Sequence, residues 1–299
     1  MAAGDRVTLP GHIQFGEQLL IGPGTAYRWR TLTGWEDSPA LDSGTVSRPA
    51  GHGAYPGELW AQPRTITVEG ITIRAPVAQL GEAVRRFGAG ASSMDGEQPL
   101  VVHLDDRGPL VVWARCLRRS VPVGKGYRTG TVPGAALLFE ASDPRRYSLT
   151  EQAVEVGLPR DEVGLDWHVP SGESLLALDF GAAGSTGTLS AINAGDAPAP
   201  AVLAISGPVV SPSFTCARTG LRWAYDITLG PGDELLVDAA AGTVTLAGAS
   251  RLYTATPLSA PEQLLVIPPG ENAFVFRGAA ESVPDPAARA VLRWRHAYW

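Results

Sequence analysis

Residues 65–74 show the clearest alternation of hydrophobic and polar side chains in the chain. The apolar residues at 66 and 68 fall on one parity, whereas those at 71 and 73 fall on the other. Successive side chains of a strand point to opposite faces, so one buried face requires a change of phase inside this segment. The pattern therefore predicts a strand with a β-bulge at Glu69-Gly70, where Gly70 supplies the unusual backbone angles.

The rest of the first half predicts short strands around one helix. Apolar residues recur at helical spacing over 77–87, Pro76 suits the first turn of this helix, and Gly88 and Gly90 end it. Strands are expected at 12–21, 26–32, 100–104, 110–118 and 135–141, with a hairpin turn at 105–108. Gly, Pro, Asp or Ser stand at nearly every second or third position of 34–57, which predicts a long irregular loop that is functional or forms an interface.

The second half predicts strands and turns without a helix. Residues 151–171 are polar and contain two prolines, which is typical of a linker or crossover. Nine short strands are then expected, at 175–180, 187–193, 200–206, 221–229, 234–237, 243–247, 264–267, 273–277 and 289–298. Many short strands separated by turns indicate an antiparallel β-sandwich.

Composition and charge divide the chain near its midpoint. Of the 299 residues, 1–150 carry 16 basic and 14 acidic side chains, whereas 151–299 carry 8 basic and 16 acidic ones. We therefore predict one domain over 1–150, a linker over 151–171 and a second domain over 172–299. The net charge of −6 argues against general nucleic-acid affinity based on phosphate contacts. No signal peptide and no transmembrane segment is apparent.

The residue pattern offers no catalytic or metal-binding constellation. The five histidines are at least ten residues apart, and the two cysteines are separated by 100 residues. There is no Gly-x-Ser-x-Gly elbow and no phosphate-binding Gly-rich motif. The adjacent carboxylates Asp105-Asp106 and Asp161-Glu162 are neighbours in sequence and are not expected to face one another across a substrate. We therefore expect no enzyme activity, no cofactor and no metal.

Eight tryptophans leave a carbohydrate-binding surface open as an alternative. Most of them lie in apolar strands, where packing in a core is the commoner role. Trp35 and Trp60, in or beside the long loop, are the best candidates for exposed aromatic side chains.

Several stretches resemble the distal tail protein family of long-tailed bacteriophages, in the form found in actinobacterial phages. Gly51-His52-Gly53-Ala54-Tyr55 precedes an Arg-x-Ile-x-x-x-Gly strand that ends at Gly70. A short helix follows, and Asp143-Pro144-Arg145-Arg146-Tyr147 is similar to the end of the family's first domain. Turn motifs at 193–200, 229–235 and 268–272, with a tryptophan in the final strand, are similar to its second domain.

The resemblance implies a mainly β protein, with a split β-barrel-like first domain containing one helix and a galectin-like antiparallel β-sandwich. It implies core positions for Trp29, Trp113, Trp223 and Trp294. It also implies a structural virion protein of the tail tip. Such proteins form a hexameric ring between tail tube and tip hub, with an open channel through which DNA passes without specific binding. The alternative is a carbohydrate-binding β-sandwich that recognises the host cell surface.

The expected partners follow from the same resemblance. They are further copies of the chain, the major tail tube protein, the tip hub and peripheral or receptor-binding baseplate proteins. The protein is expected in the virion after assembly in the bacterial cytoplasm, without membrane insertion. Candidate inter-subunit residues are Arg48, Gly51, His52, Gly53, Ala54 and Tyr55. Candidate structural residues are Gly70, Asp143, Pro144, Arg145 and Tyr147.

Overall fold

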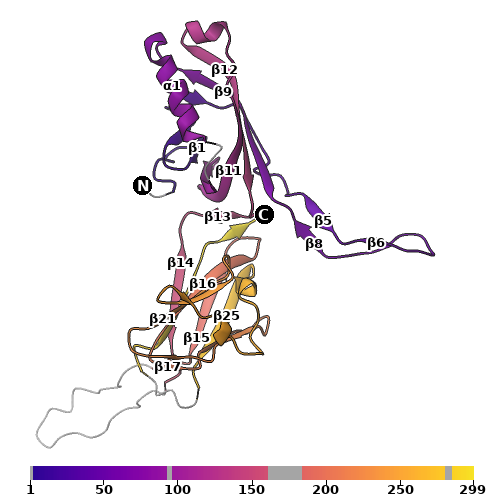
Figure 1. The fold of residues 1–299 in the computed structure, drawn as a ribbon, viewed down its shortest axis with the longest axis vertical. Coiled ribbons are helices and arrows are strands. Elements are labelled where there is room, and N and C mark those ends of the chain that lie inside the picture. Colours follow the sequence, from indigo (N-terminus) through magenta and orange to yellow (C-terminus); the bar gives the residue numbers. More distant parts are fainter. Residues whose placement is uncertain (1–2, 93–95, 161–183, 280–284) are drawn as a thin grey trace, which may run out of the picture. The chain divides into compact units, whose positions relative to one another are not determined.

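The computed structural model describes residues 3–92, 96–160, 184–279 and 285–299 (Figure 1). Contacts within the chain group it into two compact units. Unit 1 comprises Met1–Leu149 with Tyr298–Trp299, and unit 2 comprises Thr150–Ala297. Both units are built mainly of antiparallel strands, so the predicted mainly β fold is confirmed.

Unit 1 is a nearly closed, barrel-like sheet with one helix packed against it. The strand order is β2 (Leu19–Ile21), β1 (His12–Phe15), β10 (Gln98–His103), β11 (Leu110–Ser120), β12 (Thr131–Ala141), β9 (Arg64–Arg74) and β3 (Tyr27–Arg28). Three further strands join it: β4 (Thr31–Thr33) pairs with β9, β13 (Arg146–Ser148) with β11, and β27 (Ala297–Tyr298) with β13. The 3-10 helix η1 (Lys125–Arg128) precedes β12.

The predicted bulge in β9 is confirmed. Ala135 of β12 pairs with Ile71 and Leu137 pairs with Val68, so Glu69 and Gly70 together face one residue of the partner strand. Gly70 has φ +64°, a conformation that favours glycine. The bulge changes the phase of the strand, and apolar side chains on both sides of it are buried in one core.

Helix α1 (Val77–Gly90) contributes Leu80 and Phe87 to this core. The Phe87 ring lies 5.4 Å from that of Tyr27. The predicted helix over 77–87 is confirmed, but Gly88 lies inside the last turn instead of ending it. Arg119 of β11 donates to the carbonyl groups of Gly88 and Ala91. A cation is thereby placed at the negative end of the helix dipole.

Unit 2 is a set of antiparallel sheets, consistent with the predicted β-sandwich. The larger sheet has the order β14 (Gln152–Gly157), β26 (Arg289–Trp294), β16 (Ala199–Ser206), β21 (Glu234–Asp238), β22 (Thr243–Leu246) and β23 (Ala249–Ser250), with β24 (Val266–Ile267) beside β16. The second sheet contains β15 (Thr188–Asn193), β25 (Gly270–Arg277), β18 (Ser213–Cys216) and β19 (Arg222–Ala224). The remaining elements are a ladder of β17 (Val209–Val210) with β20 (Thr228–Leu229), and the 3-10 helices η2 (Leu252–Thr254) and η3 (Glu262–Leu264).

Two expectations for the second half need correction. The expected linker over 151–171 contains β14, which pairs with β26 along its whole length because its alternating residues fit the edge of that sheet. The strand expected at 221–229 is interrupted, since residues 225–227 lie between β19 and β20. The strand expected at 175–180 and the carboxylates Asp161-Glu162 lie outside the described residues.

Candidate protein-interaction site

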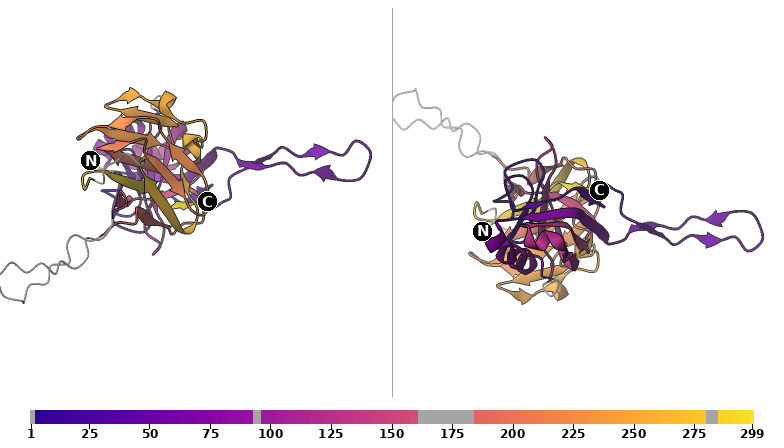
Figure 2. Two further views of the ribbon diagram at one scale, coloured as in Figure 1. Left: turned by 90° about the horizontal axis from the view of Figure 1, so that it is seen from below. Right: turned by 90° about the horizontal axis from the view of Figure 1, so that it is seen from above.

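The segment expected to be an irregular loop is a two-stranded hairpin arm. Strands β5 (Leu41–Ser43) and β8 (Leu59–Ala61) pair near its base, and β6 (Val46–Ser47) and β7 (Ala54–Tyr55) pair near its tip. Figures 1 and 2 show it as a ribbon extending from unit 1. The prediction of an irregular loop was wrong, because glycine and proline sit where this narrow ribbon turns and where its strands approach closely.

Glycines set the geometry of the arm at two places. A Cβ atom on Gly57 would lie 2.3 Å from the carbonyl carbon of Gly44, so no larger residue fits there. At the tip, Gly53 has φ +91°, and its carbonyl accepts a hydrogen bond of 3.2 Å from the Arg48 amide. The Arg48 guanidinium lies 5.1 Å from the centre of the Tyr55 ring. The structure thus places the six predicted inter-subunit residues together at the tip.

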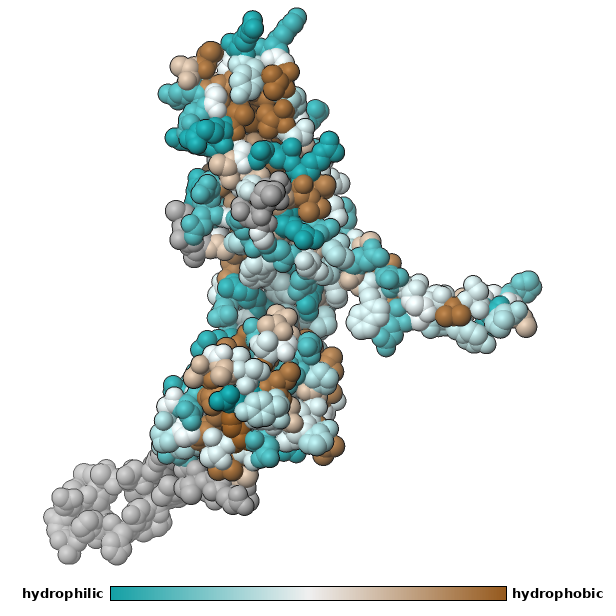
Figure 3. Space-filling view, viewed as in Figure 1, coloured by the Kyte–Doolittle hydropathy of each residue, from teal (hydrophilic) through white to brown (hydrophobic). Residues whose placement is uncertain are grey.

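The arm carries large apolar side chains that no described residue covers. The exposed fractions are 56% for Leu41, 64% for Val46, 58% for Tyr55, 64% for Leu59 and 67% for Trp60. Figure 3 shows the arm uncovered on the face that it draws. An isolated two-stranded hairpin is only marginally stable in water, and clustered exposed apolar groups mark interaction surfaces. The arm therefore has the properties of a segment that is stabilised by a partner.

One buried arginine fixes the base of the arm. Arg64 is 2% exposed, and its Nη1 donates to the carbonyls of Gly34, Trp35 and Asp37 at 2.8, 3.1 and 2.7 Å. Its Nε donates to the Pro144 carbonyl at 2.6 Å. Burial and the nearby charge of Arg146 lower the pKa of Arg64. A single side chain thereby joins the start of the arm to the end of the barrel.

Charged side chains near the surface form ion pairs at the base of the arm. Glu36 pairs with Arg107 at 3.0 Å and with Arg146 at 3.0 Å. Burial opposes ionisation of Glu36, but the hydrogen bonds from both arginines outweigh it and lower its pKa. Arg146 also lies 5.9 Å from the centre of the Trp35 ring and donates to the Trp299 carbonyl. Trp35 is 2% exposed, so the expectation that it is an exposed aromatic was wrong.

Asp143, Pro144, Arg145 and Tyr147 form the corner to which Arg64 is attached. Asp143 accepts hydrogen bonds from Nε and Nη2 of Arg145, both at 2.8 Å, and from the Tyr147 hydroxyl at 2.5 Å. Burial and the Asp143 charge raise the pKa of Tyr147. The Tyr147 ring packs against Trp113 with its centre 5.6 Å away. Four of the predicted structural residues therefore meet in one network, whereas Gly70 lies apart at the bulge.

The sequence pattern did not single out Arg64, Glu36 or Arg107. Arg64 could have been found, because it shares the parity of Ile66 and Val68 and is therefore expected on the buried face of β9. Glu36 and Arg107 are far apart in sequence, and only the fold brings them together. Trp223 and Trp294 lie in the core as predicted, whereas Trp113 is 39% exposed and Trp29 is only partly buried.

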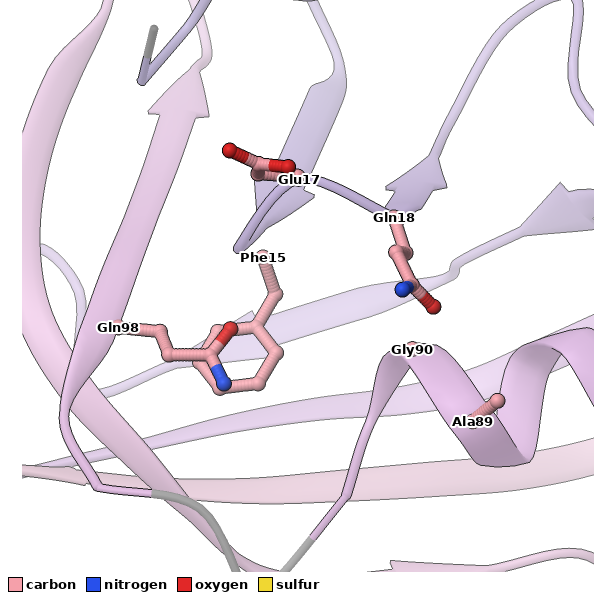
Figure 4. A pocket seen from close by; sticks show the side chains of 6 residues that line it. All are labelled: Phe15, Glu17, Gln18, Ala89, Gly90 and Gln98. Atoms are coloured by element: carbon pink, nitrogen blue, oxygen red, sulfur yellow. The ribbon is translucent and has the colours of Figure 1, made fainter. Parts of the chain in front are cut away.

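One pocket among the described residues has a lining without a catalytic arrangement. A pocket of about 220 Å³ near the end of α1 is lined by Phe15, Glu17, Gln18, Ala89, Gly90 and Gln98 (Figure 4). It offers one carboxylate, amides and a phenyl ring, with no nucleophile beside a base. Within the described ranges, no three His, Cys, Asp or Glu side chains gather as a metal site would require. No helix in those ranges has the length and apolar composition needed to cross a bilayer.

Comparisons with known proteins bear on the fold. No protein-family model and no curated protein matches the chain. Among solved structures, it is similar to the SPP1 Dit (gp 19.1) protein, described as a paradigm of the hub adsorption apparatus in phages that infect Gram-positive bacteria. The TM-score is 0.64 at 10% identity, over 96% of this chain and 99% of that one.

The chain shares the fold of the SPP1 Dit protein. Structures of the phage P2 baseplate in its activated conformation, with Ca and with Sr, align at a TM-score of 0.49 and 9% identity. These cover 95% of this chain and 97% of the other. At such low identity the likeness to SPP1 Dit concerns the fold and leaves the function to be argued separately.

Proposed function

We propose that this protein is a structural component of a bacteriophage tail tip, where it forms a hexameric ring between the tail tube and the tip hub. The observation that supports this proposal is the likeness to SPP1 Dit, which covers 96% of this chain and therefore both of its units. A chain that shared only a common β-sandwich would match over one unit. The ring leaves an open channel for DNA.

The arm supplies the contact between copies in this proposal. A closed ring of identical subunits needs two different patches that meet around the symmetry axis. The arm is one such patch, because its exposed apolar side chains have no place in the core of its own chain. Unit 1 makes the ring, and unit 2, which we assign to the galectin-like type, is available to other components of the tip.

A position between the tail tube and the tip hub implies further protein partners. They are the major tail tube protein, the tip hub protein and peripheral or receptor-binding baseplate proteins. The protein acts in the virion without enzyme activity, after assembly in the host cytoplasm. The actinobacterial origin suggested by the sequence resemblance belongs to this proposal as well.

The decisive experiment measures the mass of the full chain by light scattering after size exclusion, alone and with the tail tube protein. Six copies of the 31.3 kDa chain have a mass of about 188 kDa. Electron microscopy of that species should show a ring with a central channel. A chain that stays monomeric under both conditions contradicts the proposal.

A deletion variant tests the role of the arm. Removing residues 45–56 joins Gly44 to Gly57, which already lie against each other. Three residues, Gly44, Gly57 and Glu58, then connect the paired residues Ser43 and Leu59, and three-residue loops are common in hairpins. We expect this variant to stay folded and to lose ring formation. As a control outside the arm, Gly81→Ala alters an exposed position of α1 with open space around it and should still assemble. A deletion variant that forms normal rings would refute the role of the arm.

The carbohydrate-binding alternative is supported by Trp60, which is 67% exposed. Aromatic rings in such positions can stack on sugar rings. A glycan array with wild type and Trp60→Ala separates the two functions, since a lectin would retain glycans as a monomer and lose them in this variant. Trp35→Ala is no test of sugar binding, because Trp35 is buried.

A further inference from the structure

One face of the unit 1 sheet is turned away from the core and carries unpaired arginines. Strands β11, β12, β9, β3 and β4 bury their apolar residues on one side, which leaves the alternate residues on the other. Arg28, Arg74 and Arg118 are exposed residues of this outer side, and Arg30 lies between β3 and β4. We call these four residues and the threonines between them the basic face.

The strand register brings these residues onto one surface. Arg28 pairs with Thr72, two residues before Arg74 on β9. Arg118 pairs with Leu138, which pairs with Thr67 of β9. Paired residues of antiparallel strands project to the same side, so Arg28, Arg74 and Arg118 share it.

Arg30 joins this surface through the bulge. A Cβ atom on Gly70 would lie 2.8 Å from the Cβ of Arg30 and 3.4 Å from its Cδ. The absence of a side chain at Gly70 thus leaves room for the Arg30 stem to lie across the sheet. Gly70 therefore serves the basic face as well as the bulge.

The four guanidinium groups form no hydrogen bond and no ion pair with any residue that the structure describes. Arg115, on the same side of β11, pairs with Glu140 at 2.5 Å, and Arg85 and Arg86 of α1 pair with Glu82 at 2.8 Å. Glu69, at the bulge, is an exposed carboxylate without an ion pair in the described residues. The basic face thus keeps an uncompensated positive charge, although the whole chain carries −6.

We propose that the basic face binds the sugar-phosphate backbone of duplex DNA without sequence preference. Guanidinium groups and hydroxyls are the side chains that contact phosphate oxygens in protein–DNA interfaces, which are polar and positively charged. A protein partner would require an apolar centre with several anchoring side chains. Arginines and threonines predominate here, with Leu138 partly buried and Leu117 exposed beside Arg118, so the favoured partner is a polyanion. The choice of DNA as the polyanion rests on the proposed function.

The test is the salt dependence of binding to a fluorescein-labelled 24-base-pair duplex, followed by fluorescence anisotropy of the full chain. Four phosphate contacts predict that the binding constant falls about 150-fold between 50 and 200 mM NaCl. Arg28→Gln/Arg118→Gln should weaken binding at least about tenfold at 50 mM NaCl and make the log–log salt slope shallower by about 1.8. Binding should be equal for duplexes of different sequence.

The matched control is Arg85→Gln/Arg86→Gln, which changes the net charge equally on the exposed face of α1. It should leave the slope unchanged. Equal losses in both double variants, or no binding by wild type at 50 mM NaCl, overturn the inference. A change of mass by Arg28→Gln/Arg118→Gln without a change in DNA binding would overturn it too, because the face would then be a protein interface.

Light scattering of the same samples separates this inference from the proposed function. Wild type that binds DNA without forming rings supports the basic face and contradicts the ring. Rings that do not bind DNA contradict the inference about the basic face and leave the proposed function intact.

Discussion

The hairpin arm and its base belong to one continuous segment, yet they are held in opposite ways. At the base, Arg64 and Trp35 are buried, the Asp143 corner is half-buried, and their hydrogen bonds lie within the chain. Along the arm, Val46, Tyr55 and Trp60 are exposed, and the contacts that would cover them are missing. Changes at the base should therefore lower stability, whereas changes in the arm should alter assembly.

The largest effect on stability is expected from Arg64→Leu. Four carbonyl groups lose their donor in a buried place, which should cost about 3–5 kcal/mol in the unfolding free energy of unit 1. Urea denaturation of the full chain measures it. Arg85→Leu, at a fully exposed ion pair, should leave the denaturation midpoint nearly unchanged. Equal midpoints for these two variants would refute the anchoring role of Arg64.

Two glycine variants sharpen the contrast between base and arm. Gly34 has φ +80°, and a Cβ there would lie 1.9 Å from the Thr65 carbonyl oxygen. Gly34→Ala should therefore destabilise unit 1 by about 2–3 kcal/mol in urea denaturation. Gly57→Ala creates a similar clash, but within the arm. It should leave the denaturation midpoint nearly unchanged and impair ring formation in light scattering.

A smaller loss is expected from Tyr147→Phe. The variant keeps the ring against Trp113 and removes the hydrogen bond to Asp143, which should cost about 1–2 kcal/mol. Thermal unfolding of the two proteins side by side measures the difference. Tyr253→Phe is the matched control, since Tyr253 is 79% exposed and its change should have no effect. An equal Tm for Tyr147→Phe and wild type would show that the corner does not depend on this bond.

Glu36 gives the base a modest dependence on pH. The pKa of Glu36 is lowered in the folded state. Its ionised carboxylate therefore contributes fully to the unfolding free energy above pH 4.5, the ordinary pKa of a glutamate, and this contribution is lost as the pH falls through the lower pKa of the folded state. Because the carboxylate is partly exposed, solvent screening limits the effect to less than about 1 kcal/mol. Glu36→Gln should lower stability at pH 7 but not at pH 2–3. A difference that persists unchanged at low pH would contradict this assignment.

The smallest effect on stability is expected from Val46→Ser/Tyr55→Ser. Both side chains are already exposed, so the unfolding free energy of the isolated chain should change by less than about 0.5 kcal/mol. The same variant should reduce the fraction of rings in light scattering. A large loss of stability in the monomer would show that the arm packs within its own chain, and would remove the contrast with the base.

The sequence by itself determined the local structure in segments whose apolar residues follow one clear period, either that of a strand or that of a helix. The alternation in β9 with its change of phase at Gly70 predicted both the strand and its bulge, and the helical spacing over 77–87 predicted α1. These features depend on neighbouring residues, so they can be read along the chain. The turn residues around 105–108 predicted the hairpin of β10 and β11 for the same reason.

The tertiary structure alone decided which residues meet. Whether glycine and proline in 34–57 make a loop or a hairpin depends on pairing across the segment. Trp35 is buried because it packs in the core of unit 1, where Arg146, more than 100 residues away, lies over its ring. The basic face is a further case, since Arg28, Arg74 and Arg118 share a surface only through the register of four strands. Which strands pair, and in which register, depends on the burial of whole strand faces, so this information cannot be read from the residue pattern of one segment.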